Sequence, residues 1–317
     1  MDVVALGELL IDFTCISTDA DGYPTMAAHP GGAPANFLAA LAKFGAKTAL
    51  MGKVGSDTFG KLLTATLRRA GIETAGLIET EDVFTTLAFV TLDETGNREF
   101  SFARKPGADT CIAFEELDLS LIDEAKVFHF GTLSLTDEPA RSAAYRAVEY
   151  AKSRGKLITY DPNLRKPLWK DLAICREQML WGLAQADVVK ISDEEVEFLF
   201  DLGVEDGAEH ILRNYGVKLV FVTCGAAGCF FKNTKAEGRV PALSGIQVID
   251  TTGAGDIFGG SAVWKLLRTE KNPEELELDE LLEIVSFACT AAGLSTTRSG
   301  GISSVPEYAE VMEKISG

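Results

Sequence analysis

The sequence lacks the signatures of several common protein classes. Its 317 residues contain 30 Lys and Arg against 47 Asp and Glu, so a net charge of −17 leaves no basic surface for nucleic acid or anionic lipid. The longest uncharged stretch, residues 22–42, is broken by three prolines and is not expected to span a membrane. The N-terminal segment MDVVALGELLID has no basic region of a secretory signal. We therefore expect a cytoplasmic protein that binds neither nucleic acid nor membranes.

Residues for metal and thiol chemistry are also sparse. The three His and six Cys residues are scattered, without CxxC or HExxH spacing, which disfavours a zinc site. The cysteines are expected to act as small buried hydrophobic side chains. No GxSxG, GxxxxGK[ST] or GxGxxG pattern occurs, which disfavours a serine hydrolase, a P-loop protein and a dinucleotide-dependent dehydrogenase.

The sequence instead contains a regular alternation of short apolar runs and helical patterns. Strands are expected at 3–11, 48–54, 126–130, 156–160, 187–191, 218–223 and 246–249. Helices are expected at 34–44, from the caps Ser56 and Asp57 to Gly71, and at 138–154, 193–202, 206–215, 256–268, 277–296 and 306–315. This alternation predicts an α/β fold: a doubly wound, mostly parallel central sheet with helices on both faces.

Two segments depart from the alternation and predict a small β-sheet lid. Residues 85–105 form two β-like runs joined by the turn-rich residues 93–97, and residues 13–30 lack helical periodicity. We expect a discontinuous lid made of 13–30 and 82–110, on an α/β domain made of 1–12, 31–81 and 111–317.

The segment IQVIDTTGAGDIFGG, residues 246–260, predicts an anion site. Gly253 and Gly255 let backbone N–H groups converge, and the start of the following helix adds partial positive charge. Asp256 in the first helical turn is either an ordinary cap or, beside a bound phosphate, the acceptor of a proton from an attacking hydroxyl. The segment indicates either phosphoryl transfer or a simple helix entry.

Two further positions suit a polyol ligand. The two glycines of PGGAPAN, residues 30–36, permit close approach of a ligand, and Asn36 offers both a donor and an acceptor. Asp12 lies at the end of the first expected strand, where open α/β sheets bind ligands. Each also has a simpler interpretation, a helix entry for the first and a turn cap for the second.

Two more segments follow later strands. The small residues of 222–228 could accommodate a base or ribose, or form only a hairpin turn. In KISDEE, residues 190–195, Ser192 is expected as a helix N-cap and Glu195 as its capping-box partner.

Together these segments resemble the ribokinase-like (PfkB) family of sugar kinases, most of all its bacterial fructokinase branch. The most specific parts are PGGAPANFLAALAKFGAKTALMGKVGSDTFG (30–60) and DTTGAGDIFGG (250–260). DPNLRKPLW (161–169), KISDEE (190–195) and FARKPGAD (102–109) favour fructokinases.

The resemblance implies a kinase that transfers the γ-phosphoryl group of ATP to a sugar hydroxyl, converting fructose to fructose 6-phosphate. Mg²⁺ is implied as a cofactor, and K⁺ as a further ion. The family also implies a homodimer formed through the lid. Alternatives are a kinase for 2-keto-3-deoxygluconate, ribose or a nucleoside analogue, and an inactive sugar-binding regulator.

The resemblance also implies roles for matching positions. Those for catalysis are Asp256 as the base and Gly253, Ala254 and Gly255 as the anion hole. Those for the sugar are Asp12, Gly31, Gly32, Asn36, Arg104 and Arg165. Those for the nucleotide are Lys190, Glu195, Thr223, Gly225, Gly228 and Cys289. Those for a monovalent cation are Asp250, Thr252, Gly300 and Ser304. Two positions depart from the family: Ser192 replaces the Asn of the NxxE motif, and Cys289 stands where an Asn often borders the adenine.

Overall fold

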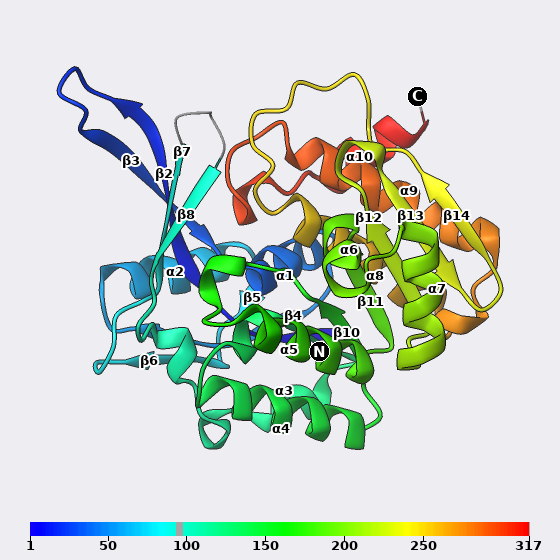
Figure 1. The fold of residues 1–317 in the computed structure, drawn as a ribbon, viewed down its shortest axis with the longest axis horizontal. Coiled ribbons are helices and arrows are strands. Elements are labelled where there is room, and N and C mark those ends of the chain that lie inside the picture. The colour runs from blue at the N-terminus through cyan, green and yellow to red at the C-terminus, as the bar shows by residue number, and fades with distance from the viewer. Residues whose placement is uncertain (93–97, 317) are drawn as a thin grey trace.

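The computed structural model describes residues 1–92 and 98–316, and within them it confirms the expected α/β class. A ten-stranded central sheet has the order β14-β13-β12-β11-β10-β9-β1-β4-β5, with β6 also paired to β4. A separate four-stranded sheet, ordered β3-β2-β7-β8, stands at one side of the molecule (Figure 1). The residues between β7 and β8, expected as a turn at 93–97, lie outside the described residues.

The central sheet is parallel except at one edge. Its strands are β1 (Val3–Leu6), β4 (Thr48–Gly55), β5 (Ile72–Glu73), β6 (Leu77–Thr80), β9 (Val127–Gly131), β10 (Leu157–Asp161), β11 (Val188–Ser192), β12 (Leu219–Thr223), β13 (Cys229–Asn233) and β14 (Glu237–Val240). Among the described strands of this sheet, only β13 and β14, which extend it beyond β12, pair antiparallel. The carboxyl ends of the parallel strands therefore share one edge, where ligands bind in such folds.

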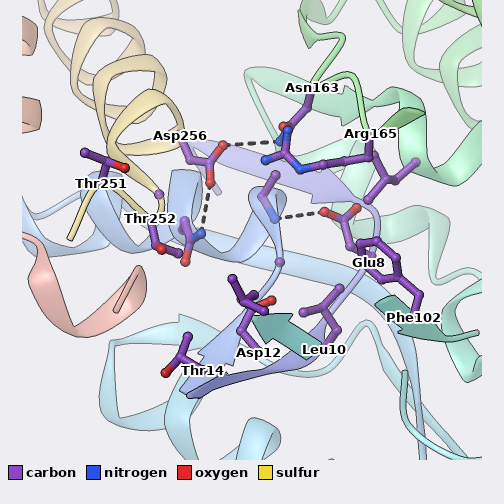
Figure 2. Close-up of a pocket in the computed structure, with 16 residues that line it drawn as sticks. Glu8, Leu10, Asp12, Thr14, Phe102, Asn163, Arg165, Thr251, Thr252 and Asp256 are labelled. Atoms are coloured by element: carbon purple, nitrogen blue, oxygen red, sulfur yellow. Dashed lines mark hydrogen bonds between the residues drawn. The ribbon is translucent and has the colours of Figure 1, made fainter. Parts of the chain in front are cut away.

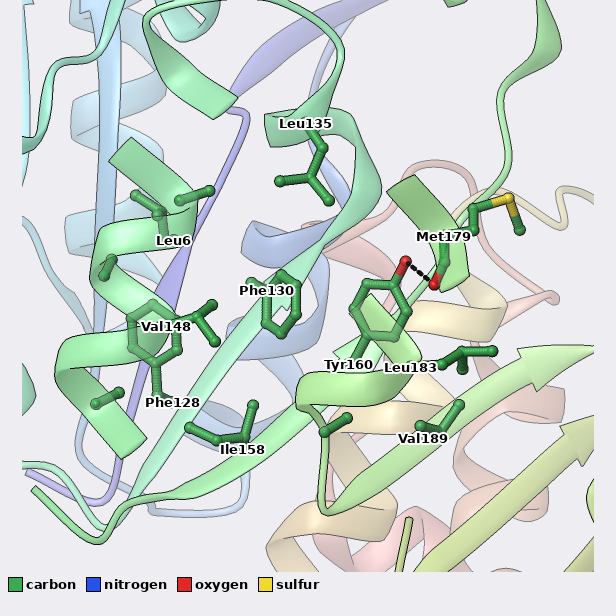
Figure 3. Packing of buried hydrophobic residues seen from close by; sticks show 14 of the residues in the cluster. Leu6, Phe128, Phe130, Leu135, Val148, Ile158, Tyr160, Met179, Leu183 and Val189 are labelled. Atoms are coloured by element: carbon green, nitrogen blue, oxygen red, sulfur yellow. Dashed lines mark hydrogen bonds between the residues drawn. The ribbon is translucent and has the colours of Figure 1, made fainter. Parts of the chain in front are cut away.

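Helices cover both faces of the central sheet. They are α1 (Ala33–Lys43), α2 (Thr58–Arg69), α3 (Leu119–Glu124), α4 (Ala140–Ser153), α5 (Leu172–Gln185), α6 (Asp193–Phe200), α7 (Val204–Tyr215), α8 (Ala254–Thr269), α9 (Leu278–Ser295) and α10 (Tyr308–Ser316). Helices α3 to α7 pack on one face against alternate strand residues such as Leu6, Phe128 and Tyr160 (Figure 3). Helices α1, α2, α8, α9 and α10 pack on the other, against residues such as Val3 and Phe221. Since neighbouring residues of a strand point to opposite faces, burial on both sides explains the continuous apolar runs in the sequence.

The small sheet accounts for the two segments that depart from the α/β pattern. Its strands are β2 (Leu10–Thr18), β3 (Pro24–Gly31), β7 (Leu87–Leu92) and β8 (Arg98–Ala103). The strands that were expected within residues 13–30 and 85–105 are thus confirmed. Strand β2 pairs in parallel with β7 and antiparallel with β3.

Two strand predictions need correction. Residues 3–11 are not one strand, because the chain leaves β1 at Gly7 and enters β2 at Leu10 in the other sheet. Residues 246–249 form no strand: Val248 and Ile249 are 56% and 62% exposed. The backbone N–H of Ile249 donates to the carbonyl of Thr296 at 2.8 Å, so the segment is tied to the end of α9 instead of to a sheet.

Helix α5 is not predicted by the periodicity of the sequence. Its buried residues include Gln178 and Gly182, while Leu172 is 43% exposed. Polar and apolar side chains therefore do not separate onto two faces. No helix within the described ranges is long and apolar enough to cross a membrane.

Candidate active site

A cavity lies where the small sheet meets the carboxyl edge of the central sheet. It is lined by Glu8, Leu10, Asp12, Thr14, Gly32, Ala33, Asn36, Val90, Phe102, Leu133, Asn163, Arg165, Thr251, Thr252, Gly253 and Asp256 (Figure 2). Strands of the small sheet, loops that follow β1, β9 and β10 of the central sheet, and the starts of α1 and α8 contribute residues to it. A small molecule bound there would contact several polar side chains, as expected for a specific ligand site.

The start of helix α8 is shaped by Gly253. Its φ of 76° is left-handed, and a Cβ there would lie 3.0 Å from Gly301 Cα and 3.1 Å from Asn36 Nδ2. Only glycine fits this turn without strain. The first N–H groups of α8 have no acceptor within the helix. One of them, Ala254 N, donates to the carbonyl of Thr251, which precedes the helix, at 3.3 Å. The turn therefore presents backbone donors and the positive end of a 16-residue helix to the cavity.

Asp256 projects from the first turn of α8 and is buried. Its Oδ2 accepts a hydrogen bond from Asn36 Nδ2 at 2.9 Å, and its Oδ1 accepts one from Asn163 Nδ2 at 3.4 Å (Figure 2). Burial raises the pKa of Asp256, while Lys190, the hydrogen bond from Asn36 and Arg165 act against the rise. Two amides thus fix the orientation of a carboxylate that remains available to accept a proton.

A buried ion pair lies directly below the turn. Lys190 Nζ is 3.0 Å from Asp161 Oδ2, and a Cβ on Gly255 would come within 2.9 Å of the same Nζ. Burial alone would lower the pKa of Lys190, but the carboxylates of Asp161, Glu195 and Asp256 outweigh it and raise the pKa. A positive charge therefore lies next to the turn that is expected to hold an anion.

Asp12 lies in β2, not at the end of the first strand. It pairs with His29 of β3 and Ala88 of β7, so it stands at the root of the small sheet and faces the cavity. Burial raises its pKa to about 6, partly offset by Arg165. A Cβ at Gly31 would lie 2.1 Å from Asp12 Oδ2, which explains the first glycine of the pair.

Gly32 begins helix α1 with a φ of 118°. A Cβ there would lie 2.4 Å from the Glu8 carbonyl oxygen, so the backbone passes close to the segment between β1 and β2. The close approach places Asn36, one turn further along α1, against Asp256.

Glu195 holds the loop that carries Asn163 and Arg165. Ser192 Oγ accepts from Glu195 N at 3.2 Å and Glu195 Oε2 accepts from Ser192 N at 2.8 Å, which confirms the predicted capping box. The other oxygen, Oε1, accepts from Leu164 N at 2.6 Å. Glu195 therefore joins the start of α6 to the residues that follow β10.

Arg104 does not line the cavity. Its guanidinium is buried, with an ion pair to Asp109 Oδ2 at 2.7 Å and hydrogen bonds to Thr136 Oγ1 at 2.8 Å and the Leu133 carbonyl at 2.9 Å. In this structure Arg104 connects the end of β8 to the segment after β9 through these hydrogen bonds.

The four remaining nucleotide candidates lie apart from the cavity. Thr223 ends β12, Gly225 and Gly228 form the turn into β13 with φ values of 51° and 95°, and Cys289 is buried on α9 near the Val240 carbonyl. The small residues of this segment thus form a hairpin turn, at the strand edge shared with the cavity.

The residues that are expected to bind a monovalent cation lie in two loops and connect them. Asp250 Oδ1 accepts from Thr252 N at 2.9 Å and from Thr252 Oγ1 at 2.7 Å, and Asp250 Oδ2 accepts from Gly300 N at 3.0 Å. Ser304 is buried, and its hydroxyl donates to the Gly301 carbonyl at 2.8 Å. The carboxylate of Asp250 thereby ties the turn before α8 to the loop before α10.

The sequence analysis assigns no role to several residues of the cavity, among them Thr251, Asn163 and Glu8. Thr251 belongs to the glycine-rich segment, and Asn163 follows β10 with a left-handed φ of 49°. Glu8 is a charged residue within an apolar run, and its Oε1 accepts from Ala33 N at 2.8 Å. A carboxylate inside an otherwise apolar strand region was the available signal for Glu8.

The whole chain is similar to known sugar kinases. Fructokinase-1 from Zea mays is 42% identical over 317 residues, covering 99% of this chain and 97% of that protein. The structure of a fructokinase from Xylella fastidiosa with bound ATP matches with a TM-score of 0.91 at 30% identity, covering 99% of this chain and 98% of that one. A double-mutant fructokinase from Vibrio cholerae, with fructose, ADP and potassium bound, matches with a TM-score of 0.87 at 28% identity, covering 99% and 98%. The model of the pfkB family carbohydrate kinases matches residues 1–308, and the chain belongs to that family.

Proposed function

We propose that this chain is an ATP-dependent fructokinase that forms fructose 6-phosphate. The observation that carries the proposal is Asp256, held by two amides at the start of α8 within a polar cavity. Family membership and relatives named fructokinase support the same reaction. A carboxylate beside the anion site favours a kinase over an inactive sugar-binding regulator.

In the proposed reaction Asp256 is the general base. The O–H bond of the sugar hydroxyl breaks and its proton goes to Asp256, while that oxygen bonds to the γ-phosphorus of ATP. The bond from the γ-phosphorus to the bridging oxygen breaks, and ADP leaves. A carboxylate cannot ionise an alcohol beforehand, so proton transfer accompanies phosphoryl transfer and depends on position.

The anion site is proposed to hold the transferred group. Gly253, Ala254 and Gly255 surround it with backbone groups, and Lys190 adds charge from below. These groups stabilise negative charge on the γ-phosphoryl oxygens in a largely dehydrated site. We place the rest of the nucleotide along the strand edge towards Thr223, Gly225, Gly228 and Cys289.

The residues beneath the anion site fit a Mg²⁺ ion held mainly by phosphates. Asp161 Oδ1 is buried without a hydrogen-bond partner, and Asp161 interacts electrostatically with Glu195 and Asp256. Within residues 1–92 and 98–316 no group of three or more His, Cys, Asp or Glu side chains could hold a metal alone. That matches an ion bound through substrate phosphates and water with few protein ligands. Bound Mg²⁺ would neutralise phosphate charge.

The sugar is proposed to lie between Asp12, Asn36 and Arg165, under the small sheet. We assign residues 13–30 and 82–110 as a lid on the α/β domain. Val90 and Phe102 of this lid line the cavity, which lets it exclude water from the phosphoryl group. Arg104 supports the lid through its contacts to Thr136 and Leu133, so we propose an indirect role for Arg104 in sugar binding.

The loops joined by Asp250 are proposed to hold a monovalent cation. Backbone carbonyls around Thr252, Gly300 and Ser304 would supply most of its ligands, because the Asp250 oxygens already accept three hydrogen bonds. The Vibrio cholerae relative contains potassium, which supports K⁺ as the ion.

We also propose a homodimer formed through the small sheet. Ile16 and Tyr23 are 65% and 70% exposed on the β2–β3 hairpin, and a second subunit would cover them. A cytoplasmic location fits the use of ATP and the six free cysteines. Light scattering tests this proposal: we expect the mass of a dimer for wild type and the mass of a monomer for Ile16→Lys.

The function is tested by ADP release with a panel of sugars and Mg-ATP. We expect the highest kcat/KM with fructose. The assignment is wrong if ribose or 2-keto-3-deoxygluconate exceeds fructose by more than about tenfold, roughly 1.4 kcal/mol of transition-state binding. Absence of ADP release with every sugar would favour a binding protein.

A further inference from the structure

Glu8 lines the cavity but has no place in the reaction described above. It lies between β1 and β2, its side chain is buried, and no cation forms an ion pair with it within the described residues. Burying a carboxylate that forms no ion pair is costly: burial raises the pKa of Glu8 to about 7, and the charge of Arg104 offsets this rise only in part. A polar partner from outside the chain would offset this cost.

One oxygen of Glu8 has a structural role. Helix α1 begins at Gly32, which has no side chain to cap it, and Glu8 Oε1 accepts from Ala33 N at 2.8 Å instead. This hydrogen bond fixes the start of α1, and therefore Asn36. It does not require the second oxygen, and the other donor that the described residues offer to the carboxylate is the backbone N–H of Glu8 itself.

Glu8 and Asp256 lie in different parts of the cavity. Figure 2 shows Glu8 on the side of Phe102, and Asp256 towards Thr251 and Thr252. The electrostatic surroundings agree, since the charged neighbours of Glu8 are Asp109 and Arg104, whereas those of Asp256 include Lys190 and Arg165. A sugar whose reacting hydroxyl lies at Asp256 would place its other end near Glu8.

We propose that Glu8 Oε2 accepts a hydrogen bond from a hydroxyl at the end of the sugar that is not phosphorylated. Glu8 thereby selects for that hydroxyl, because a sugar without it leaves the buried carboxylate with one hydrogen bond fewer. The proposal rests on the sugar kinase function, and it identifies a specificity residue beyond those that hold the reacting hydroxyl.

Glu8→Gln separates sugar binding from helix capping. The N–H of Ala33 requires an acceptor, so the amide oxygen of Gln takes the place of Oε1 and its NH₂ group faces the sugar. The hydrogen bond that caps α1 is kept, while the acceptor Oε2 that faces the sugar is replaced by a donor. We expect the KM for fructose to rise about tenfold or more, with the KM for ATP nearly unchanged. Glu280→Gln is the matched control, because Glu280 Oε2 caps α9 through Glu277 N at 3.0 Å, away from the cavity.

Monodeoxy derivatives of fructose identify the hydroxyl. Wild type should discriminate against one remote-end derivative by about tenfold or more, and Glu8→Gln should lose that discrimination alone. Wild-type behaviour of Glu8→Gln towards fructose would show that Glu8 is only a cap. Retention of every deoxy penalty in the variant would also overturn the proposal. If wild type phosphorylates another sugar and not fructose, the proposed function fails, and the same comparison with deoxy forms of that sugar decides the role of Glu8.

Discussion

Asn36 Nδ2 donates to Asp256 Oδ2 at 2.9 Å, joining the first turns of α1 and α8 across 220 positions of the sequence. The backbone at Gly253 and Gly301 encloses the same amide, since a Cβ at Gly301 would lie 2.1 Å from Asn36 Oδ1. The two helices pack against each other, and this hydrogen bond helps to orient the proposed base where they meet. Because Asn36 donates to Oδ2, the other oxygen, Oδ1, which accepts the longer hydrogen bond of 3.4 Å from Asn163 Nδ2, can also face a substrate hydroxyl.

Replacing Asp256 tests the assignment of the base. Asp256→Asn keeps the shape and the hydrogen-bonding capacity of the side chain, but an amide oxygen is a negligible base. We expect kcat to fall by roughly 10²–10⁴, the range typical of general-base catalysis. Folding and nucleotide affinity, measured by calorimetry, should change little. Near-normal turnover would show that Asp256 is only a helix cap.

Replacing Asn36 tests the contact itself. Asn36→Asp puts a second carboxylate 2.9 Å from Asp256 Oδ2, and two such groups share a proton because both cannot easily ionise. A proton shared at Oδ2 makes Oδ1, the oxygen that faces the sugar hydroxyl, a much weaker base. We expect the acid limb of the kcat–pH profile to move up by about one pH unit or more.

The matched control for that experiment is Asn214→Asp. Asn214 is an Asn on α7 whose side chain donates to the His210 carbonyl at 2.9 Å, on the protein surface. It adds the same charge without approaching Asp256. An unshifted limb in Asn36→Asp, or an equal shift in the control, would contradict the role given to Asn36.

The sequence predicts most of the fold because the central sheet is buried on both faces. Continuous apolar runs of the correct length mark its strands, and capping residues such as Asp57 and Ser192 mark helix starts. The strand prediction for residues 246–249 was wrong because Val248 and Ile249 are apolar yet exposed. The contact of Ile249 with Thr296 holds this segment outside the sheet. Helix α5 escaped prediction since Gln178 and Gly182 interrupt its buried face.

The site was predictable where local chemistry is unusual. Gly253 and Gly32 have positive φ angles and mark backbone turns that favour glycine, while Gly31 and Gly255 leave room for the side chains of Asp12 and Lys190. The partners of those turns come from distant parts of the chain, and no local pattern relates Asn163 to Asp256 or Glu8 to Ala33. The inward ion pair of Arg104 with Asp109 likewise depends on tertiary packing.

Potassium is expected to increase activity. Asp250 ties the turn before Gly253 to Gly300, so an ion between these loops would stiffen the anion site without touching the sugar. We expect a higher kcat in KCl than in a bulky organic cation chloride at equal ionic strength. Equal rates in the two salts would contradict the proposed cation site. An effect confined to the KM for the sugar would indicate that the cation binds near the sugar and not beside the anion site.

The charged form of Asp12 is expected to lower the free energy of unfolding while it contributes to sugar binding, and the loss of stability should depend on pH. Its pKa is raised to about 6 in the folded protein from an ordinary 3.8, because burial penalises the charged form. Between these two values the folded state binds more protons than the unfolded state, so the free energy of unfolding falls as pH rises through this window. Asp12→Asn removes the ionisation. We expect it to raise stability by on the order of 1–2 kcal/mol at pH 7.5 and to change it little near pH 4.

The two effects of Asp12→Asn should separate in the same preparation. Urea denaturation at the two pH values measures stability, and turnover at pH 7.5 measures function. An amide presents donors where the sugar hydroxyls need an acceptor, so kcat/KM for the sugar should fall about tenfold or more while the protein becomes more stable. A variant that loses stability at pH 7.5 would show that the charge of Asp12 is paired in the folded protein. A stable variant with unchanged kcat/KM would place the sugar away from Asp12, since a carboxylate that costs folding energy without binding substrate has no compensating role.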